Sequence, residues 1–409
     1  MRAEIVAVGT ELLLGDVVDT NSSFIAQRLA AAGIECHFQT RVGDNSERIV
    51  EALERASARA EAVVVCGGLG PTPDDITRDA LAKFLGVPLE RDQAMVGRIG
   101  AIFETRSASM PANNARQGDR PRGGKFIEQR LGTAPGLICM SAQGSVIYAV
   151  PGVPAEMTEM MTRAVIPDLR RQVGPAGTTT IVSRSLLTWG LSESALAELV
   201  AERIDAQTNP TLAFLASGPR GIKLRITARA ADAEEATAMI EAEEAELRTI
   251  LGSLVFGIDT DSMASAVGRL VEEKGLTVGV AESLTGGLVG AALAEVPGSS
   301  AWFRGSVVAY HPTVKFNVVG VPEGPVVAAE AAEALALGAA RVLGADIGLG
   351  ITGAAGPEPC EDQPPGTVFM ATAIDGQAIS VGTHIRGDRE QVRHLAVINL
   401  LNLLRLRLG

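Results

Sequence analysis

Short apolar runs alternate along the chain with longer segments whose apolar residues recur at helical spacing. In the N-terminal part, residues 5–8, 34–42, 62–66 and 145–150 are predicted strands, and residues 21–32 are a predicted helix closed by a glycine. Strands that alternate with helices, with glycine loops at the strand ends, are typical of a parallel α/β domain. Ligands of such sheets bind beyond the C-terminal strand ends, so those loops are the first places to look for a site.

The same alternation returns near the C-terminus, after a stretch in which it is lost. Predicted elements there are a strand at 276–280, a helix at 288–295, a strand at 305–310, a helix at 328–343, a strand at 347–351, a hairpin at 366–374 and 377–385, and a terminal helix after Gly387. Between the two parts we expect a strand at 178–187, a helix at 193–205, a half-exposed strand at 221–229 and an Ala/Glu-rich helix at 231–251. We therefore predict an N-terminal α/β domain over 1–165, a small α+β connector over 166–257 and a C-terminal α/β domain over 258–409.

Composition narrows the classes of function. The 409 residues carry a formal charge of −12 and only 3% aromatic side chains, which argues against nucleic-acid binding. No apolar run reaches the roughly 18 to 20 residues of a membrane helix, and the first residues enter a predicted strand directly, so we expect neither a membrane span nor a signal peptide. Four scattered cysteines without pair or metal spacing favour a reduced, cytoplasmic setting.

The turn at 281–287, Ala-Glu-Ser-Leu-Thr-Gly-Gly, is the first candidate site. It joins a predicted strand to a predicted helix. Backbone N–H groups at a helix N-terminus bind phosphate or carboxylate, so Thr285, Gly286 and Gly287 are candidate substrate ligands. The hydroxyl of Ser283 could serve there as a nucleophile. The alternative is a plain helix N-cap with a glycine turn.

The loop at 67–79 is the N-terminal candidate. Its glycines, Gly67, Gly68 and Gly70, let a ligand approach the backbone, and Thr72 adds a hydroxyl. Three carboxylates, those of Asp74, Asp75 and Asp79, offer the hard oxygens that divalent metals prefer. A helix N-cap with acidic residues suited to the helix dipole is the alternative. Just before this region, residues 44–47 have the pattern of a capping box that starts a helix.

Two further features lie in the C-terminal part. Thr352-Gly-Ala-Ala-Gly-Pro357 is another hydroxyl-and-glycine loop at a strand end. Arg389 and Arg393 lie four residues apart, on one face of the predicted terminal helix. An arginine suits phosphate through its planar fork of donors, and spacing does not say which of the two would bind it.

Taken together, these motifs resemble the competence/damage-inducible CinA family along the whole chain. The N-terminal motifs are Gly9-Thr-Glu-Leu-Leu, Asn21-Ser, Val42-Gly-Asp-Asn, Gly67-Gly-Leu-Gly-Pro-Thr-Pro-Asp-Asp-Ile-Thr-Arg, Gly132-Thr-Ala-Pro-Gly and Pro151-Gly-Val-Pro-Ala-Glu-Met. The C-terminal motifs are Ala281-Glu-Ser-Leu-Thr-Gly-Gly, Val296-Pro-Gly-Ser-Ser, Val308-Ala-Tyr, Lys315, Thr352-Gly-Ala-Ala-Gly-Pro and Gly387-Asp-Arg.

For the N-terminal part, the resemblance implies a three-layer, parallel-sheet domain similar to molybdopterin-binding (MogA/MoaB-like) domains. The activity implied is a metal-dependent pyrophosphatase acting on ADP-ribose. Asp74, Asp75 and Glu11 would hold a divalent metal of unknown identity, and Asn21, Thr133 and the loop glycines would bind the substrate.

For the C-terminal part, the resemblance implies an α/β deamidase that hydrolyses the carboxamide of nicotinamide mononucleotide (NMN) without a metal or other cofactor. Ser283 would be the nucleophile and Lys315 its base, with Tyr310, Thr352 and Gly353 placed around base and substrate. Together the two activities would recycle pyridine nucleotides. Small phosphorylated nucleotides are thus the expected ligands, and a homodimer is the expected assembly.

Two departures from the family pattern keep another function open. Leu284 stands where the family has a cysteine, and we expect its side chain to point into the core. The loop at 356–366 carries Glu358, Glu361 and Asp362 where the family has a glycine-rich loop with a lysine. Carboxylates near a phosphorylated substrate would repel it, which favours a nucleotide- or molybdopterin-binding protein whose deamidase site is weak or inactive. A role in molybdenum-cofactor insertion is favoured less, because residues 71–75 follow the CinA pattern.

Overall fold

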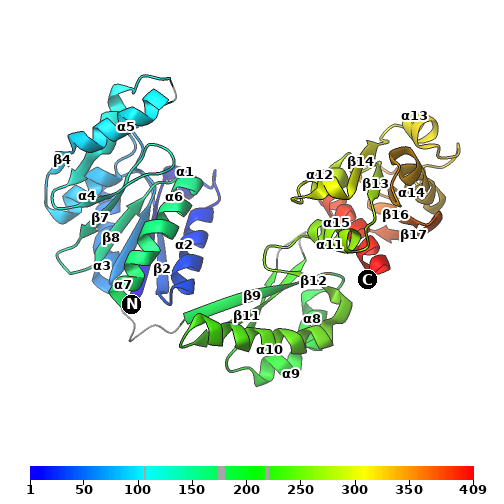
Figure 1. Cartoon of the computed structure of the whole chain (residues 1–409), viewed down its shortest axis with the longest axis horizontal. Helices are drawn as coiled ribbons and strands as arrows, with labels where there is room; N and C mark the ends of the chain where they lie inside the picture. Colours follow the sequence, from blue (N-terminus) through cyan, green and yellow to red (C-terminus); the bar gives the residue numbers. More distant parts are fainter. Residues whose placement is uncertain (106, 174–179, 217–220) are drawn as a thin grey trace. The chain divides into compact units, whose positions relative to one another are not determined.

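The computed structural model describes residues 1–105, 107–173, 180–216 and 221–409 (Figure 1). The chain forms two compact units. One unit comprises Met1–Val182 with Ala228–Met239, and the other comprises Ser183–Thr227 with Ile240–Gly409. Each is described by itself below.

The first unit is built on a six-stranded sheet. Its strand order is β2 (Glu35–Val42), β1 (Arg2–Val8), β3 (Ala62–Cys66), β8 (Val146–Val150), β7 (Gly136–Met140) and β6 (Lys125–Ile127). The first four strands run parallel, and β7 and β6 are antiparallel. The predicted strands therefore form the parallel part of the sheet, and their carboxyl ends meet at one edge.

Helices cover both faces of this sheet (Figure 1). The α-helices of this unit are α1 (Thr10–Leu14), α2 (Thr20–Ala31), α3 (Ser46–Arg59), α4 (Thr77–Leu85), α5 (Gln93–Thr105), α6 (Pro154–Met160) and α7 (Ile166–Val173), and β4 (Leu89–Arg91) and β5 (Asp119–Pro121) form a short ribbon. One core packs α2, α6 and α7 on the face that carries Ile5 and Val64, and the other packs α3 and α4 on the face that carries Val6 and Val65. Strand residues alternate between faces, so this pattern confirms the three-layer prediction.

The helix predicted to start with a capping box at 44–47 has its N-cap one residue later than expected. Asn45 is the N-cap of α3 and its side chain accepts from the N–H of Arg48. Asp44 turns to the end of β1 instead, where one carboxylate oxygen accepts from both the backbone N–H and the hydroxyl of Thr10, at 2.8 and 2.9 Å. A long-range partner thus displaces Asp44 from the local cap, and brings it to the sheet edge where a ligand would bind.

The connector contributes a four-stranded sheet to the second unit, in the order β10 (Thr211–Ala216), β11 (Ile222–Ala230), β9 (Thr180–Thr188) and β12 (Val255–Ile258). Residues 178–179 of the strand predicted over 178–187 lie outside the described residues. The helix predicted over 193–205 is two helices, α8 (Glu193–Leu199) and α9 (Ala201–Ala206), which break at the buried Val200. The Ala/Glu-rich helix α10 (Ala233–Leu251) follows the predicted bounds closely.

The C-terminal part has a five-stranded sheet, in the order β14 (Phe303–Val308), β13 (Val278–Glu282), β15 (Ile347–Gly353), β16 (Thr367–Ile374) and β17 (Gln377–His384). Strands β14, β13 and β15 are parallel, β16 and β17 form the predicted hairpin, and β16 also pairs antiparallel with β15. Helices α11 (Met263–Glu273), α12 (Leu288–Ala294) and α15 (Arg389–Leu408) share one core with the sheet, and α14 (Ala329–Leu343) packs in a separate cluster.

Glycines in β15 let α14 lie very close to the sheet. A Cβ on Gly348 would sit 1.8 Å from the carbonyl oxygen of Ala336, and one on Gly350 would sit 2.2 Å from that of Ala332. Side chains at these positions would push the helix off the sheet, which explains the glycines without any role in chemistry.

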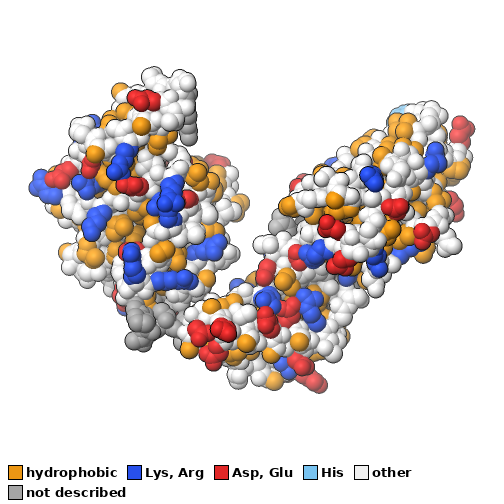
Figure 2. Space-filling model, in the orientation of Figure 1, with side chains coloured by type: hydrophobic (Ala, Val, Ile, Leu, Met, Phe, Trp, Pro, Cys, Tyr) orange, Lys and Arg blue, Asp and Glu red, His pale blue; other side chains and the backbone are white. Residues whose placement is uncertain are grey.

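Among the described residues, no helix is long and apolar enough to cross a membrane. On the face shown in Figure 2, basic side chains are interspersed with acidic ones. This face therefore offers no continuous basic stripe of the kind that follows a nucleic-acid backbone.

Candidate active sites

The glycine loop after β3 forms the wall of a cavity of about 360 Å³ in the first unit. Gly67 and Gly68 have φ of 110° and 65°, and a Cβ on Gly67 would lie 2.1 Å from the carbonyl oxygen of Val8. Only glycine fits there, because the backbone is left-handed and packed against β1. The loop therefore presents bare backbone to the cavity.

Most of the predicted N-terminal residues line this one cavity. They are Glu11, Gly67, Gly68, Gly70, Asp74, Asp75 and Thr133. Asn21 lines an adjoining cavity of about 130 Å³ that shares Glu11 and Gly152 with the first. The amide of Asn21 donates to the carbonyl of Gly152 at 2.7 Å, and its buried carbonyl oxygen has no partner among the described residues.

The side chains of Asp75 and Thr72 hold the loop together. The two oxygens of Asp75 accept from the N–H of Gly70 at 2.7 Å and from the N–H of Thr72 at 2.9 Å, and the Thr72 hydroxyl also donates to Asp75. The Thr72 side chain is thus engaged within the loop, and it is not among the cavity-lining residues. Asp74 is exposed.

Two arginines that the sequence did not single out brace the same loop from outside the cavity. Arg78 is 2% exposed and donates to the carbonyls of Leu69 and Gly70, and its burial lowers the pKa of the guanidinium to about 10. Arg116 donates to the carbonyl of Thr72 at 2.7 Å. Arg78 is buried and Arg116 is half-buried and also pairs with Asp79, and both donate to carbonyls of this loop, so they fix its shape.

Asp44 and Glu156 also line the cavity; both stand in the motifs quoted above, but the sequence did not single them out as site residues. A spacing argument could have found Glu156, since it follows the loop after β8, the next parallel strand along the sheet. Among the described residues, no three His, Cys, Asp or Glu side chains come close enough together to form a metal site. The carboxylates therefore share a cavity without forming a ready-made cage.

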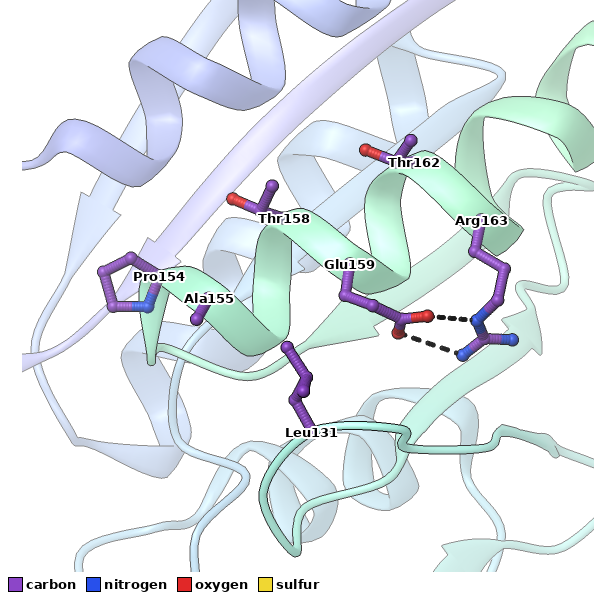
Figure 3. A pocket seen from close by; sticks show the side chains of 7 residues that line it. All are labelled: Leu131, Pro154, Ala155, Thr158, Glu159, Thr162 and Arg163. Carbon is purple, nitrogen blue, oxygen red and sulfur yellow. Dashed lines mark hydrogen bonds and ion pairs between the residues drawn. The ribbon is translucent and has the colours of Figure 1, made fainter. Parts of the chain in front are cut away.

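A third hollow lies along α6, as Figure 3 shows, and is not part of this site. Its lining is Leu131, Pro154, Ala155, Thr158, Glu159, Thr162 and Arg163. Glu159 and Arg163 form an ion pair one helical turn apart, so the two charges satisfy each other. Because the remaining lining is aliphatic or hydroxyl, this hollow brings together no catalytic group.

In the second unit, three parallel strands bring the C-terminal candidates to one sheet edge. Ser283 follows β13 directly, and its N–H donates to the carbonyl of Ile351 in β15 at 3.0 Å. Thr352 comes next in β15, while Lys315 follows β14, which pairs with the other side of β13. The topology thus gathers the predicted nucleophile, base and hydroxyl beyond adjacent strand ends.

The turn after Ser283 does not form the phosphate cradle that we expected. The carboxylate of Glu282, which is 0% exposed, accepts from the N–H groups of Gly287, Val289 and Gly290 at 2.8–3.0 Å. The hydroxyl of Ser306 donates to it as well, at 2.7 Å. The protein's own anion therefore fills the N-terminus of α12, and substrate phosphate has to bind elsewhere.

Gly286 also differs from the prediction as a ligand, because its N–H donates to the carbonyl of Ser283 at 3.0 Å. The backbone N–H groups of Leu284 and Thr285 have no recorded acceptor in the described part of the chain, and the buried hydroxyl of Thr285 is also without a partner. Leu284 is buried in the core, as predicted for the neighbour of Ser283. The turn thus leaves unused donors only beside Ser283.

The two arginines of α15 have different partners. Arg393 donates to the carbonyls of Leu284 and Thr285 at 3.0 and 2.8 Å, so it braces the turn from behind. Arg389 is exposed and donates to the hydroxyl of Tyr310 at 2.7 Å and to the carbonyl of Gly356 at 2.8 Å. Of the two, Arg389 is the one placed to reach a ligand.

Lys315 is a buried cation at the start of a π-helical turn. It is 2% exposed, and its ammonium donates to the carbonyl of Tyr310 at 3.1 Å. Burial lowers the pKa of Lys315 from its usual 10.5, while the nearby Cys360 and Glu361 oppose the shift. A lysine needs such a lowered pKa to act as a base.

Thr352 and Gly353 stand at the end of β15 in structural positions. The buried hydroxyl of Thr352 donates to the carbonyl of Val326 at 2.6 Å. A Cβ on Gly353 would lie 2.4 Å from the carbonyl oxygen of Thr367, so the glycine is required by the neighbouring strand. Thr352 therefore orients the segment before α14.

Three family models match the chain in succession. A probable molybdopterin binding domain matches residues 4–171, the KH domain of damage-inducible protein CinA matches 183–257, and the CinA C-terminal domain matches 260–408. A CinA-like protein of Frankia casuarinae is 41% identical, over 99% of this chain and 96% of its own length. A CinA-like protein of Thermosynechococcus vestitus is 43% identical, over 100% of this chain and 99% of its own length.

Proposed function

Since the chain belongs to the CinA-like family, we propose that its C-terminal domain is an amidohydrolase that converts NMN to nicotinate mononucleotide and ammonia. One observation carries the proposal: Ser283 and the buried Lys315 lie beyond neighbouring parallel strands, and burial lowers the pKa of that lysine. A serine and a neutral lysine are sufficient for acyl transfer. Ammonia release from NMN tests the assignment.

In the proposed reaction, neutral Lys315 takes the hydroxyl proton as Ser283 attacks the carboxamide carbon. The developing oxyanion accepts from the N–H groups of Leu284 and Thr285, which have no other acceptor. Lysine returns the proton to the leaving nitrogen, and ammonia departs. Water, deprotonated by Lys315, then hydrolyses the ester to the carboxylate and frees Ser283.

The contacts of Arg389 and Arg393 predict different roles, Arg389 in binding the substrate phosphate and Arg393 in holding the turn after Ser283. Arg389→Met should raise KM for NMN about tenfold or more, because a charged donor to the substrate phosphate is lost. Arg393→Met should instead lower kcat and the melting temperature, since two carbonyls of the nucleophile turn lose their donor.

Nicotinamide riboside, which lacks the phosphate, provides the control. Arg389→Met should lose the preference for NMN over the riboside, and Arg393→Met should keep it. The reverse pattern of preference would assign the phosphate to Arg393 and contradict this division.

For the N-terminal domain we propose a metal-dependent hydrolysis of the ADP-ribose pyrophosphate. The glycine loop offers backbone to phosphate, and Glu11 and Asp74 offer carboxylates to the same cavity. Because no three ligands converge within the described part of the chain, the residues there fit a cation that arrives with substrate phosphates and needs only one or two carboxylates, as Mg²⁺ does. Such an ion would neutralise charge on the pyrophosphate oxygens.

This arrangement predicts different defects for the two aspartates. Asp74→Asn should raise the metal concentration needed for half-maximal ADP-ribose turnover and leave the melting temperature unchanged, because Asp74 is exposed. Asp75→Asn should reduce turnover and also lower the melting temperature, since its carboxylate holds Gly70 and Thr72. Turnover that persists at full rate in a chelator would rule out the metal.

A further inference from the structure

The backbone N–H groups of Val326 and Val327 converge on a single oxygen. Both donate to Oε2 of Glu361, at 2.7 and 2.9 Å. Two successive N–H groups aimed at one oxygen form a nest, which is an arrangement that binds anions. Its present occupant is a carboxylate of the acidic loop at 356–366.

This nest belongs to the environment of the proposed base. The charge of Glu361 acts on the buried ammonium of Lys315, opposing the effect of burial on its pKa. The hydroxyl of Thr352 holds the carbonyl of Val326 at 2.6 Å, and so fixes the peptide that carries one of the two donors. The nest therefore lies within electrostatic range of the buried Lys315, and Thr352 fixes one of its two peptides.

The helix behind the nest adds to its positive potential. Helix α14 begins at Ala329, and its N-cap, Ala328, has no side chain that could accept from the first turn. The segment that carries Val326 and Val327 thus leads directly into the N-terminus of a 15-residue helix, whose first turn has no side-chain cap and carries the acidic Glu330. The two N–H groups of the nest and the N-terminus of α14 both favour an anion at this position.

Glu361 occupies the nest from an exposed loop held in an unfavourable backbone conformation. Glu361 and Asp362 have φ of 49° and 61°, a left-handed region that costs non-glycine residues free energy. The side chain is exposed at the surface, so its charged hydrogen bonds compete with water and with dissolved anions.

We infer that the Val326–Val327 nest is an anion-binding subsite, occupied in the free protein by Glu361, and that a phosphate or carboxylate oxygen of a small ligand takes its place. A ligand must then displace Glu361 to bind, so Glu361 sets the ligand concentration that binding requires. The acidic loop in this way regulates access to the site beside Lys315. The inference rests on the proposed function only for the identity of the nucleotide, since the nest itself can be tested with inorganic anions.

Hydrogen exchange at the amides of Val326 and Val327 in the full chain reports on the nest directly. Glu361→Ala should make these two amides exchange about tenfold faster or more, because their charged acceptor is removed. Millimolar inorganic phosphate should restore their protection in this variant. Glu358→Ala removes the same charge from an exposed position on the same loop, and should leave the exchange of both amides as in the wild type.

The same experiment with acetate in place of phosphate shows whether the nest prefers a carboxylate or a phosphate. The anion that restores protection at the lower concentration is the preferred one. The inference is overturned if neither anion restores protection in Glu361→Ala, or if Glu358→Ala has the same effect. Restored protection in Glu361→Ala, with no ammonia released from NMN by the wild-type chain, would uphold the subsite and reject the proposed amidohydrolase.

Discussion

Ser283→Ala should lower kcat for NMN hydrolysis by at least about 10³-fold, because no other group would form the acyl intermediate. The variant should fold normally, since the backbone N–H of Ser283, which bonds to Ile351, is unchanged. Ammonia release at saturating NMN is the measurement, and the melting temperature shows whether the fold is intact.

Ser300→Ala is the matched control, because it removes an exposed hydroxyl from the same domain. It should retain the wild-type rate. A Ser283→Ala protein that released ammonia as fast as Ser300→Ala would show that Ser283 is not the nucleophile.

Lys315 should set the pH dependence of the same reaction. Only its neutral amine can accept the hydroxyl proton, so kcat/KM should rise with pH through the lowered pKa of Lys315 and level off above it, before pH 10.5 is reached. Lys315→Met should lose about 10²- to 10⁴-fold in rate, together with this rise. Lys315→Arg should be equally inactive, because a guanidinium stays protonated.

The lowered pKa of Lys315 also determines how the free energy of unfolding changes with pH. Since the pKa of Lys315 is lower in the folded state, the unfolded chain binds more protons between the two pKa values, and the free energy of unfolding rises with pH in that window. Lys315→Met should remove this rise. The exposed Lys274→Met serves as control and should change neither profile, and a Lys315→Met protein with the wild-type pH–rate profile would refute the role of base.

The architecture could be predicted because its signals are local. Apolar runs such as residues 62–66 and 347–351 are long enough to be buried on both faces, and they became the central strands β3 and β15. Glycines at the ends of these strands marked the loops in which the candidate residues lie. Strand order beyond β13 could not be predicted, since pairing with β14 or β15 depends on contacts distant in sequence.

The errors have a common physical cause, which is competition for hydrogen-bond donors. Gly286 and Gly287 have the spacing of a phosphate cradle, but Glu282 lies close enough to fill it. Asp44 has the position of a cap, but the hydroxyl and N–H of Thr10 bind it more directly. A sequence shows which groups can donate or accept, and the fold decides which of them pair.

The central claim, that Ser283 and Lys315 hydrolyse an amide, is tested most directly by identifying the products formed from NMN by the full chain in the presence of a chelator. The account predicts ammonia and nicotinate mononucleotide in equal amounts, since only the C–N bond of the carboxamide breaks. Release of free nicotinamide, or recovery of unchanged NMN, would contradict it.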